Sequence, residues 1–148
     1  MINREEQRKY GNPFKQLFIR NYQKKITGIL RGIKFGNSLE VGAGTGRFWR
    51  RDGKDIFKPD YGCDLDLDCA RGNSACGRLV CADGLHLPCG DNRFDLVIAL
   101  EVLEHCRDYD RLLAELVRVS RKFVLLGVPW EPYFRMMNLA ALNHWRRL

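Results

Sequence analysis

The 148-residue chain is 45% hydrophobic and 29% charged, a composition typical of one globular domain that excludes an intrinsically disordered chain. No apolar run reaches the ~20 residues that a membrane helix needs, and residues 1–10 are too polar for a secretory signal, so we expect no membrane span and a cytoplasmic location. The formal net charge is +7, and the basic excess is concentrated in residues 1–51, which carry 12 basic and 3 acidic side chains.

The first predicted element is a helix over residues 14–31. Apolar side chains recur there at helical spacing, from Phe14 through Tyr22 to Leu30, so the helix is amphipathic. We expect its apolar stripe to pack on a sheet or to cover the mouth of a binding site. The basic residues on this helix and shortly after it have two interpretations: a solvated helix face, or a surface that attracts an anionic substrate, a nucleic acid or a membrane.

A short strand and a glycine-rich turn are predicted next. Residues 38–41 form the strand, and glycine then occupies every second position from Gly42 to Gly46. Glycine permits positive φ and lets a ligand approach the backbone closely, and a helix is expected to begin near Arg47. The Gly-x-Gly-x-Gly spacing differs from the dinucleotide-binding and P-loop patterns. Because Glu40 would repel a phosphate, the turn suits a ligand that carries an ammonium group.

The second predicted strand, over residues 61–64, ends in a carboxylate. Asp64 lies 18 positions after the last glycine of the turn. An acidic residue at about this distance, at the tip of the next strand, can accept hydrogen bonds from a ribose diol. Asp66 and Asp68 follow closely, so the assignment among the three acids stays open, and helix N-capping is the alternative role of Asp66.

Two more strands bring further polar residues to the same edge of the sheet. The third, over residues 79–84, ends in Asp83-Gly84. The fourth, over residues 94–100, is apolar almost throughout, which is typical of a strand buried on both faces of a parallel sheet. Since active-site groups in such sheets lie outside the carboxyl ends of the strands, the residues after position 100 are candidates for a catalytic role.

The segment Glu40 to Gly46 resembles the first motif of class I S-adenosylmethionine-dependent methyltransferases. The acidic strand ends and the apolar fourth strand follow in the order of that family's later motifs, so the resemblance covers residues 38–129 and is strongest for the broad small-molecule and quinone-biosynthesis group. It implies an α/β, Rossmann-like, doubly wound sheet with parallel strands in the order 3-2-1-4-5 and flanking helices. We expect a single domain, 1–148, made of an N-terminal helical region (1–37), a cofactor-binding core (38–129) and a tail (130–148).

The resemblance also implies S-adenosylmethionine as the cofactor. It assigns Asp64 to the ribose hydroxyls and Asp83 to the adenine amino group. The cofactor-binding residues that it implies are Glu40, Gly42, Ala43, Gly44, Gly46, Asp64, Leu65, Asp83, Gly84 and Leu100.

Glu101, Glu104 and His105 directly follow the fourth strand, and their spacing would place them on one face of a helical turn. Two carboxylates and an imidazole can hold a divalent metal or act as a general base. The segment is similar to Glu-x-x-Glu-His in ubiquinone-biosynthesis O-methyltransferases and in small-RNA 2′-O-methyltransferases. In the small-RNA family, such residues hold a magnesium ion together with a later histidine. Here His144 is the only later histidine, the rest of that RNA family's pattern is missing, and the six cysteines contain no Cys-x-x-Cys pair. We therefore expect no metal and assign Glu101 and His105 as catalytic, with a structural role for His105 as the alternative.

A helix over residues 109–120 and a fifth strand over residues 123–129 complete the predicted core. Members of the family usually continue with two more strands, which this sequence lacks. We therefore expect either a truncated chain or an exposed sheet edge that is covered by the tail or by another subunit, as in a homodimer. The aromatic side chains of the tail are candidates for a substrate pocket or for this cover: Trp130, Tyr133, Phe134 and Trp145.

The predicted function is methyl transfer from S-adenosylmethionine to an unidentified nucleophile. A small-molecule methyl acceptor, such as a quinone-like metabolite, is the first expectation, and a nucleic acid (RNA) is the alternative. A non-catalytic scaffold that binds the cofactor is the second alternative, because a chain without the last strands could lack an acceptor site. The fold alone does not identify the substrate.

Overall fold

The protein is described by a computed structural model over residues 13–66 and 75–128. The helices are α2 (Pro13–Gly32) and α4 (Tyr109–Val119), with short 3-10 helices η1 (Arg47–Trp49) and η2 (Leu103–His105). The strands are β1 (Ser38–Val41), β2 (Arg50–Arg51), β3 (Lys54–Asp55), β4 (Tyr61–Asp64), β5 (Arg78–Cys81), β6 (Phe94–Leu100) and β7 (Ser120–Gly127). No helix in these two ranges is both long and apolar enough to cross a membrane.

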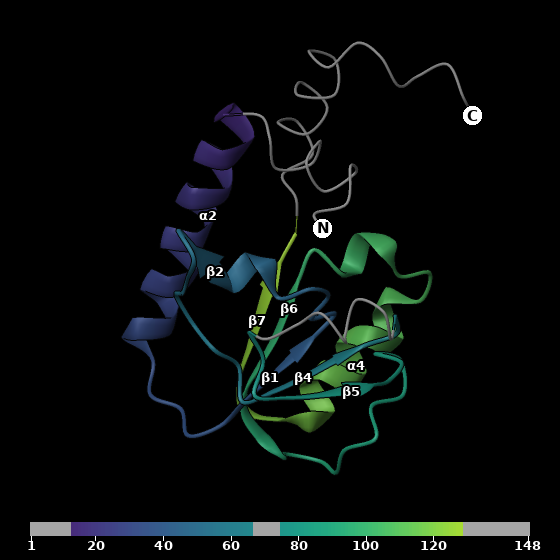
Figure 1. The fold of residues 1–148 in the computed structure, drawn as a ribbon. Helices are drawn as coiled ribbons and strands as arrows, with labels where there is room; N and C mark the ends of the chain where they lie inside the picture. Colours follow the sequence, from purple (N-terminus) through teal and green to yellow (C-terminus); the bar gives the residue numbers. More distant parts are fainter. Residues whose placement is uncertain (1–12, 67–74, 129–148) are drawn as a thin grey trace, which may run out of the picture.

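The sheet order confirms the expected doubly wound topology. Five parallel strands are ordered β5-β4-β1-β6-β7, which is 3-2-1-4-5 when the strands of this sheet are numbered along the chain. The helices α2 and α4 lie on opposite sides of this sheet (Figure 1). The carboxyl ends of β1, β4 and β6 therefore meet at one edge, where the crossover in strand order opens a site for a ligand.

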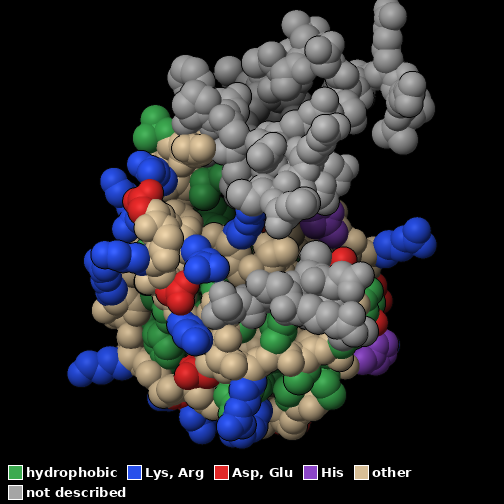
Figure 2. Space-filling model, viewed as in Figure 1, with side chains coloured by type: hydrophobic (Ala, Val, Ile, Leu, Met, Phe, Trp, Pro, Cys, Tyr) green, Lys and Arg blue, Asp and Glu red, His purple; other side chains and the backbone are tan. Residues whose placement is uncertain are grey.

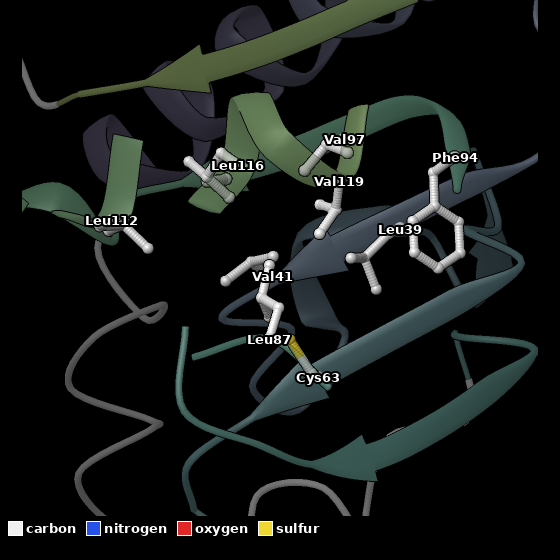
Figure 3. Close-up of a cluster of buried hydrophobic side chains, with 10 residues drawn as sticks. Leu39, Val41, Cys63, Leu87, Phe94, Val97, Leu112, Leu116 and Val119 are labelled. Atoms are coloured by element: carbon white, nitrogen blue, oxygen red, sulfur yellow. The ribbon is translucent and has the colours of Figure 1, made fainter. Parts of the chain in front are cut away.

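The central strand β6 is buried on both faces, as its continuous apolar run predicts. On one face, Val97 and Ala99 pack with Leu112, Leu116 and Val119 of α4 and its C-terminal end (Figure 3). The three α4 residues lie on one side of that helix because they recur at intervals of three and four. This face contains the larger hydrophobic cluster beneath the ligand edge of the sheet.

On the other face of β6, Leu96 and Ile98 pack against Ile26 and Leu30 of α2 and against the fully buried Trp49. The predicted helix over residues 14–31 is thus confirmed as α2, with its apolar stripe on the sheet. The fold thus has three layers, with the sheet between α2 on one face and α4 on the other.

The prediction that a helix begins near Arg47 is wrong. A single 3-10 turn, η1, is followed by the antiparallel β2–β3 hairpin, in which Arg51 pairs with Lys54. The two residues between them, Asp52 and Gly53, have φ values of 51° and 77°, and an Asp-Gly pair with two positive φ angles is typical of a tight type I′ hairpin turn. Trp49 and α2 occupy the space over the sheet that a crossover helix would otherwise cover.

Tyr22 of α2 reaches the carboxyl end of β7. A Cβ atom on Gly127 would overlap the Tyr22 hydroxyl oxygen, so the two residues are in close contact. The hydroxyl is buried and has no hydrogen-bond partner among the described residues. Burial, together with the nearby carboxylates of Glu101 and Glu104, raises the pKa of Tyr22 to about 12.

Strand β7 begins at Ser120, three residues before the predicted start, and it is the last strand of the sheet on its side. Phe123 and Leu126 on it are 37% and 40% exposed. Within the described residues, this edge strand thus carries two partly exposed apolar side chains, and the expected cover by the tail or by another subunit stays a prediction. The tail candidates Trp130, Tyr133, Phe134, His144 and Trp145, and also Asp68, lie outside the described residues.

Candidate functional site

A cavity of about 580 Å³ lies at the carboxyl edge of the sheet. Its walls come from the ends of β1, β4 and β6, from the segment after β5, and from η2 and α4. The lining residues are Val41, Gly42, Asp64, Leu65, Ala82, Asp83, Gly84, Leu85, Glu101, Val102, His105, Cys106, Arg107 and Leu112. Seven of the residues that the sequence assigns to the site are thereby brought together: Gly42, Asp64, Leu65, Asp83, Gly84, Glu101 and His105.

The glycine-rich turn follows β1 and reaches the cavity at Gly42. Gly42, Gly44 and Gly46 have φ values of 74°, 48° and 70°, a region that other L-residues rarely adopt. A Cβ atom on Gly42 would overlap the side chain of Val102, whereas a Cβ on Gly44 would meet no protein atom within 4 Å. The turn therefore packs closely against the protein at its first glycine and is open at its second.

Asp64 is held in place by backbone donors on both of its carboxylate oxygens. The Gly44 N–H donates to Oδ2 at 2.7 Å, and the Asp66 N–H donates to Oδ1 at 2.9 Å. Each oxygen retains acceptor capacity, because a carboxylate offers about four lone-pair sites. Among the candidate acids in the described ranges, Asp64 lines the cavity and Asp66 does not. Leu65, with 72% of its surface exposed, adds an apolar wall beside it.

Asp83 occupies the corresponding position after β5. Its Oδ1 accepts the Leu85 N–H at 2.9 Å, and its Oδ2 lies 3.8 Å from Nδ1 of His86. The next residue, Gly84, packs against the core: a Cβ there would lie 3.0 Å from Leu112 Cδ1 and 3.1 Å from Val41 Cγ1. The backbone at this wall is therefore close to the cavity, and the carboxylate keeps acceptor sites toward it.

The expectation that Glu101, Glu104 and His105 share one helical face is wrong. Glu101 has φ 55°, which is rare for a residue other than glycine, and the 3-10 helix η2 begins only at Leu103. The Glu101 N–H donates to the Gly127 carbonyl at 2.7 Å, which fixes this turn to the end of β7. Glu101 and His105 line the cavity, and Glu104 does not. Within residues 13–66 and 75–128, no group of three or more potential metal ligands is found.

Five assigned cofactor residues do not line the cavity: Glu40, Ala43, Gly44, Gly46 and Leu100. Gly44 adjoins it through its hydrogen bond to Asp64. Leu100 packs with the cluster beneath α2. Glu40 is 4% exposed, and its Oε2 lies 3.9 Å from the Cys76 thiol sulfur.

The pKa of the Glu40 carboxyl is raised to about 8, chiefly by burial and in addition by the nearby Asp64 carboxylate, while hydrogen bonding to Trp49 and Cys76 offsets part of the rise. The indole Nε1 of Trp49 nevertheless has no hydrogen-bond partner of normal geometry among the described residues. Glu40 is therefore protonated at neutral pH, on the side of the sheet that faces α2.

We expect the protein to lose stability as the pH rises from about 4.5 to about 8. Across this range the unfolded state has already released the Glu40 proton and the folded state still holds it, so unfolding becomes easier with rising pH. Glu40→Gln has no proton to lose and should be more stable than the wild type by about 2 kcal/mol or more at pH 9, with little difference at pH 4. Urea unfolding of both proteins from pH 4 to pH 9 measures the difference in stability, and a pH-independent difference would contradict the assignment.

Several lining residues were not assigned to the site from the sequence. Leu85 and Val102 directly follow assigned residues, so their positions beside strand ends were a usable signal. Arg107 and Leu112 come from the segments after η2 and at the start of α4, and nothing in their local sequence indicates that they reach the cavity.

These features define a class of protein: a doubly wound α/β domain with a glycine-rich turn and two acidic strand ends around one ligand cavity. Residues 39–125 match the family model described as a methyltransferase domain, which is more than half of the chain. The chain belongs to this family, the class I S-adenosylmethionine-dependent methyltransferases.

Two curated relatives and one solved structure illustrate the similarity. The chain is 35% identical over 92 residues to a malonyl-[acyl-carrier protein] O-methyltransferase of Hamiltonella defensa, covering 60% of this chain and 35% of that protein. It is 27% identical over 103 residues to a tRNA (carboxymethyluridine(34)-5-O)-methyltransferase of Schizosaccharomyces pombe, covering 69% of this chain and 44% of that protein. The structure of a methyltransferase of Thermotoga maritima aligns with a TM-score of 0.65 at 18% identity, covering 89% of this chain and 66% of that one, and shows the shared fold.

The chain thus spans less than half the length of these two curated relatives. The residues of the cavity nevertheless fit the methyl donor of the family, S-adenosylmethionine. Asp64 and Asp83 offer acceptors to hydroxyl and amino groups, the open backbone at Gly44 admits a close approach, and Leu65 and Val102 offer apolar contacts.

Proposed function

We propose that the protein transfers a methyl group from S-adenosylmethionine to a small-molecule acceptor. The observation that carries this proposal is that one cavity of about 580 Å³ is lined by Gly42 of the glycine-rich turn, by the two acidic strand ends, and by Glu101 and His105. A cofactor site and a candidate acceptor site thereby share one space. Methyl transfer needs this proximity, because the attacking atom must be held in line with the methyl group and away from water.

In this proposal Asp64 accepts hydrogen bonds from the ribose hydroxyls and Asp83 accepts one from the adenine amino group. The hydrogen bonds to Asp64 from the Gly44 and Asp66 N–H groups fix the carboxylate before the cofactor arrives. The backbone from Gly42 to Gly46 contacts the methionine part, and Glu40 and Leu100 support this backbone from the face beneath α2.

The acceptor is proposed to lie near Glu101 and His105, at the carboxyl end of β6. When bound, S-adenosylmethionine supplies an electrophilic methyl group. The imidazole of His105 takes the proton of a hydroxyl or other weakly acidic acceptor, and Glu101 orients the acceptor. The rare backbone conformation of Glu101 fixes the direction in which its side chain leaves the strand end.

The class of acceptor is the finer part of the proposal. The malonyl carrier-protein methyltransferase supports a small or carrier-bound acceptor. A cytoplasmic location and a homodimer that pairs through the partly exposed apolar side chains of β7 are further parts of the proposal. An RNA acceptor is the second candidate, because one relative is named for tRNA and because arginines surround a second hollow on the surface.

Isothermal calorimetry with S-adenosylmethionine and its demethylated product tests the cofactor site. We expect saturable binding, and Asp64→Ala should weaken it by about 1–3 kcal/mol, because buried hydroxyl groups would lose their acceptor. Asp66→Ala, two residues away and outside the cavity, is the matched control and should have a much smaller effect. No saturable heat from folded protein would reject the proposal, and a larger effect of Asp66→Ala would move the ribose site to that residue.

A further inference from the structure

A second hollow, of about 390 Å³, lies between α2 and the β2–β3 hairpin. We call it the arginine pocket; its lining residues are Gln16, Ile19, Arg20, Gln23, Arg47, Arg50, Arg51, Asp52 and Gly53. Four arginines and one aspartate line it, from segments that are far apart in the sequence. It shares no lining residue with the cofactor cavity, so the proposed methyl transfer does not account for it.

The arginine pocket has a built framework. Gln23 is 3% exposed, and its side-chain amide donates to the Phe48 carbonyl at 2.6 Å and to the Arg50 carbonyl at 3.3 Å. These two bonds fix η1 and the start of the hairpin to α2. At the other end of the hairpin, the tight Asp52-Gly53 turn restricts the backbone. The backbone that carries Arg50 and Arg51 is therefore fixed by the Gln23 hydrogen bonds on one side and by this turn on the other.

Two ion pairs within the described part of the chain join arginines of the pocket to nearby carboxylates. Arg20 pairs with Asp52 at 3.0 Å, and Arg50 pairs with Asp55 at 3.4 Å. All four of these side chains are at least 41% exposed, and exposed ion pairs of this kind are weak. A ligand with several anionic oxygens can therefore replace the carboxylates. Phosphate fits best, since the guanidinium fork matches its oxygens in pairs.

The positive charge continues beyond the pocket along α2. Arg20, Lys24 and Arg31 are exposed and lie on one side of the helix, because their spacing of 4 and 7 residues returns to nearly the same direction at 3.6 residues per turn. At 1.5 Å per residue the row is about 16 Å long. Figure 2 shows Lys and Arg side chains gathered on the side of the molecule where α2 and β2 lie. A row of this length exceeds the needs of one phosphate and suits a chain of them.

We propose that the arginine pocket binds phosphate groups of a single-stranded RNA, with successive phosphates following the row of cations along α2. The phosphate contacts hold the strand without reading its sequence, as backbone contacts do in general. The binding depends on salt, because each neutralised phosphate releases counterions. This site does not rest on the proposed methyl transfer, and its occupation is independent of the cofactor.

The test measures binding of a short, end-labelled single-stranded RNA by fluorescence anisotropy at several salt concentrations. We expect saturable binding that Arg20→Gln/Arg51→Gln weakens about tenfold or more, with the slope of log K against log salt reduced by about 1.4 for two lost contacts. The matched control, Arg78→Gln/Arg93→Gln, removes the same charge from two exposed arginines, one at the start of β5 and one just before β6, that line a different hollow. It should change the affinity about twofold or less. Cofactor affinity by calorimetry should be the same in all three proteins, which separates this site from the proposed function.

Two competitors determine the source of the phosphate. Inorganic pyrophosphate should displace the RNA only weakly, because it occupies the pocket and not the row. Binding of pyrophosphate without binding of RNA would assign the pocket to a small phosphate ligand and would overturn the proposal that it binds RNA. Two results would show a nonspecific basic surface and overturn the proposed RNA site. One is preferential binding of the protein to phosphatidylserine vesicles, and the other is an equal loss of RNA affinity in the two double variants.

Discussion

Gly44→Val is expected to abolish measurable binding of S-adenosylmethionine while the protein stays folded. The residue has φ 48°, a conformation that β-branched side chains rarely adopt. A side chain there would meet no protein atom within 4 Å of its Cβ, so it would project into the open space at the glycine-rich turn, where the cofactor is proposed to lie. Steric exclusion and a displaced turn then act together. The displaced turn also removes the Gly44 N–H from Asp64, so the ribose acceptor loses its support.

Gly53→Val separates these effects from general strain. Gly53 also has a positive φ, of 77°, and open surroundings, but it lies in the β2–β3 turn outside the cofactor cavity. Both variants should therefore lose similar stability in thermal unfolding, and only Gly44→Val should lose binding in calorimetry. Normal cofactor affinity of Gly44→Val, or equal losses of affinity in both variants, would contradict the site.

His105→Ala should lower the methylation rate by about 10²-fold or more, with the dissociation constant of the cofactor nearly unchanged. His105 lines the cavity from η2, whereas the proposed cofactor contacts come from the ends of β1, β4 and β5. Losing the base slows proton removal from the acceptor without disturbing the ribose and adenine contacts. Single-turnover rates at saturating cofactor, beside calorimetry, measure the two quantities separately.

Glu104→Gln is the control for this prediction. Glu104 is exposed and lies next to His105 in η2 but does not line the cavity, so its substitution should leave the rate unchanged. If a metal were bound instead, Glu101→Gln and Glu104→Gln would both show the loss and a chelator would reproduce it. Equal rates of wild type and His105→Ala on a verified acceptor would return His105 to a structural role.

The parts of the fold that follow from burial alone were predictable. The apolar run of β6 matches its predicted bounds because both of its faces are covered by helices. The start of β7 was placed too late because Arg121 and Lys122 are polar, and an edge strand tolerates them where a central strand would not. The missing helix after Gly46 depended on contacts between distant segments: Trp49 fills the core under α2, and only the Asp-Gly pair in the hairpin was a local signal.

The site divides in the same way. Asp64 and Asp83 were predictable because the topology brings the ends of neighbouring parallel strands to one edge. Glu40 was assigned to the ligand from its position before the turn, yet successive residues of a strand face opposite sides, and Val41 is the one that lines the cavity. The arginine pocket could not be predicted, since Arg20 and Arg51 meet only when α2 packs beside the hairpin.

The contact between Tyr22 and Gly127 constrains how this sequence can diverge. A Cβ at position 127 would overlap the Tyr22 hydroxyl oxygen and lie 2.7 Å from Leu100 Cδ2. A substitution of Gly127 is therefore tolerable only in a sequence whose residue 22 is already smaller and whose residue 100 can shift. Homologous sequences should accordingly show a correlated pair, with bulky residues at 22 accompanied by glycine at 127, although one position lies in the first described helix and the other at the end of the last described strand.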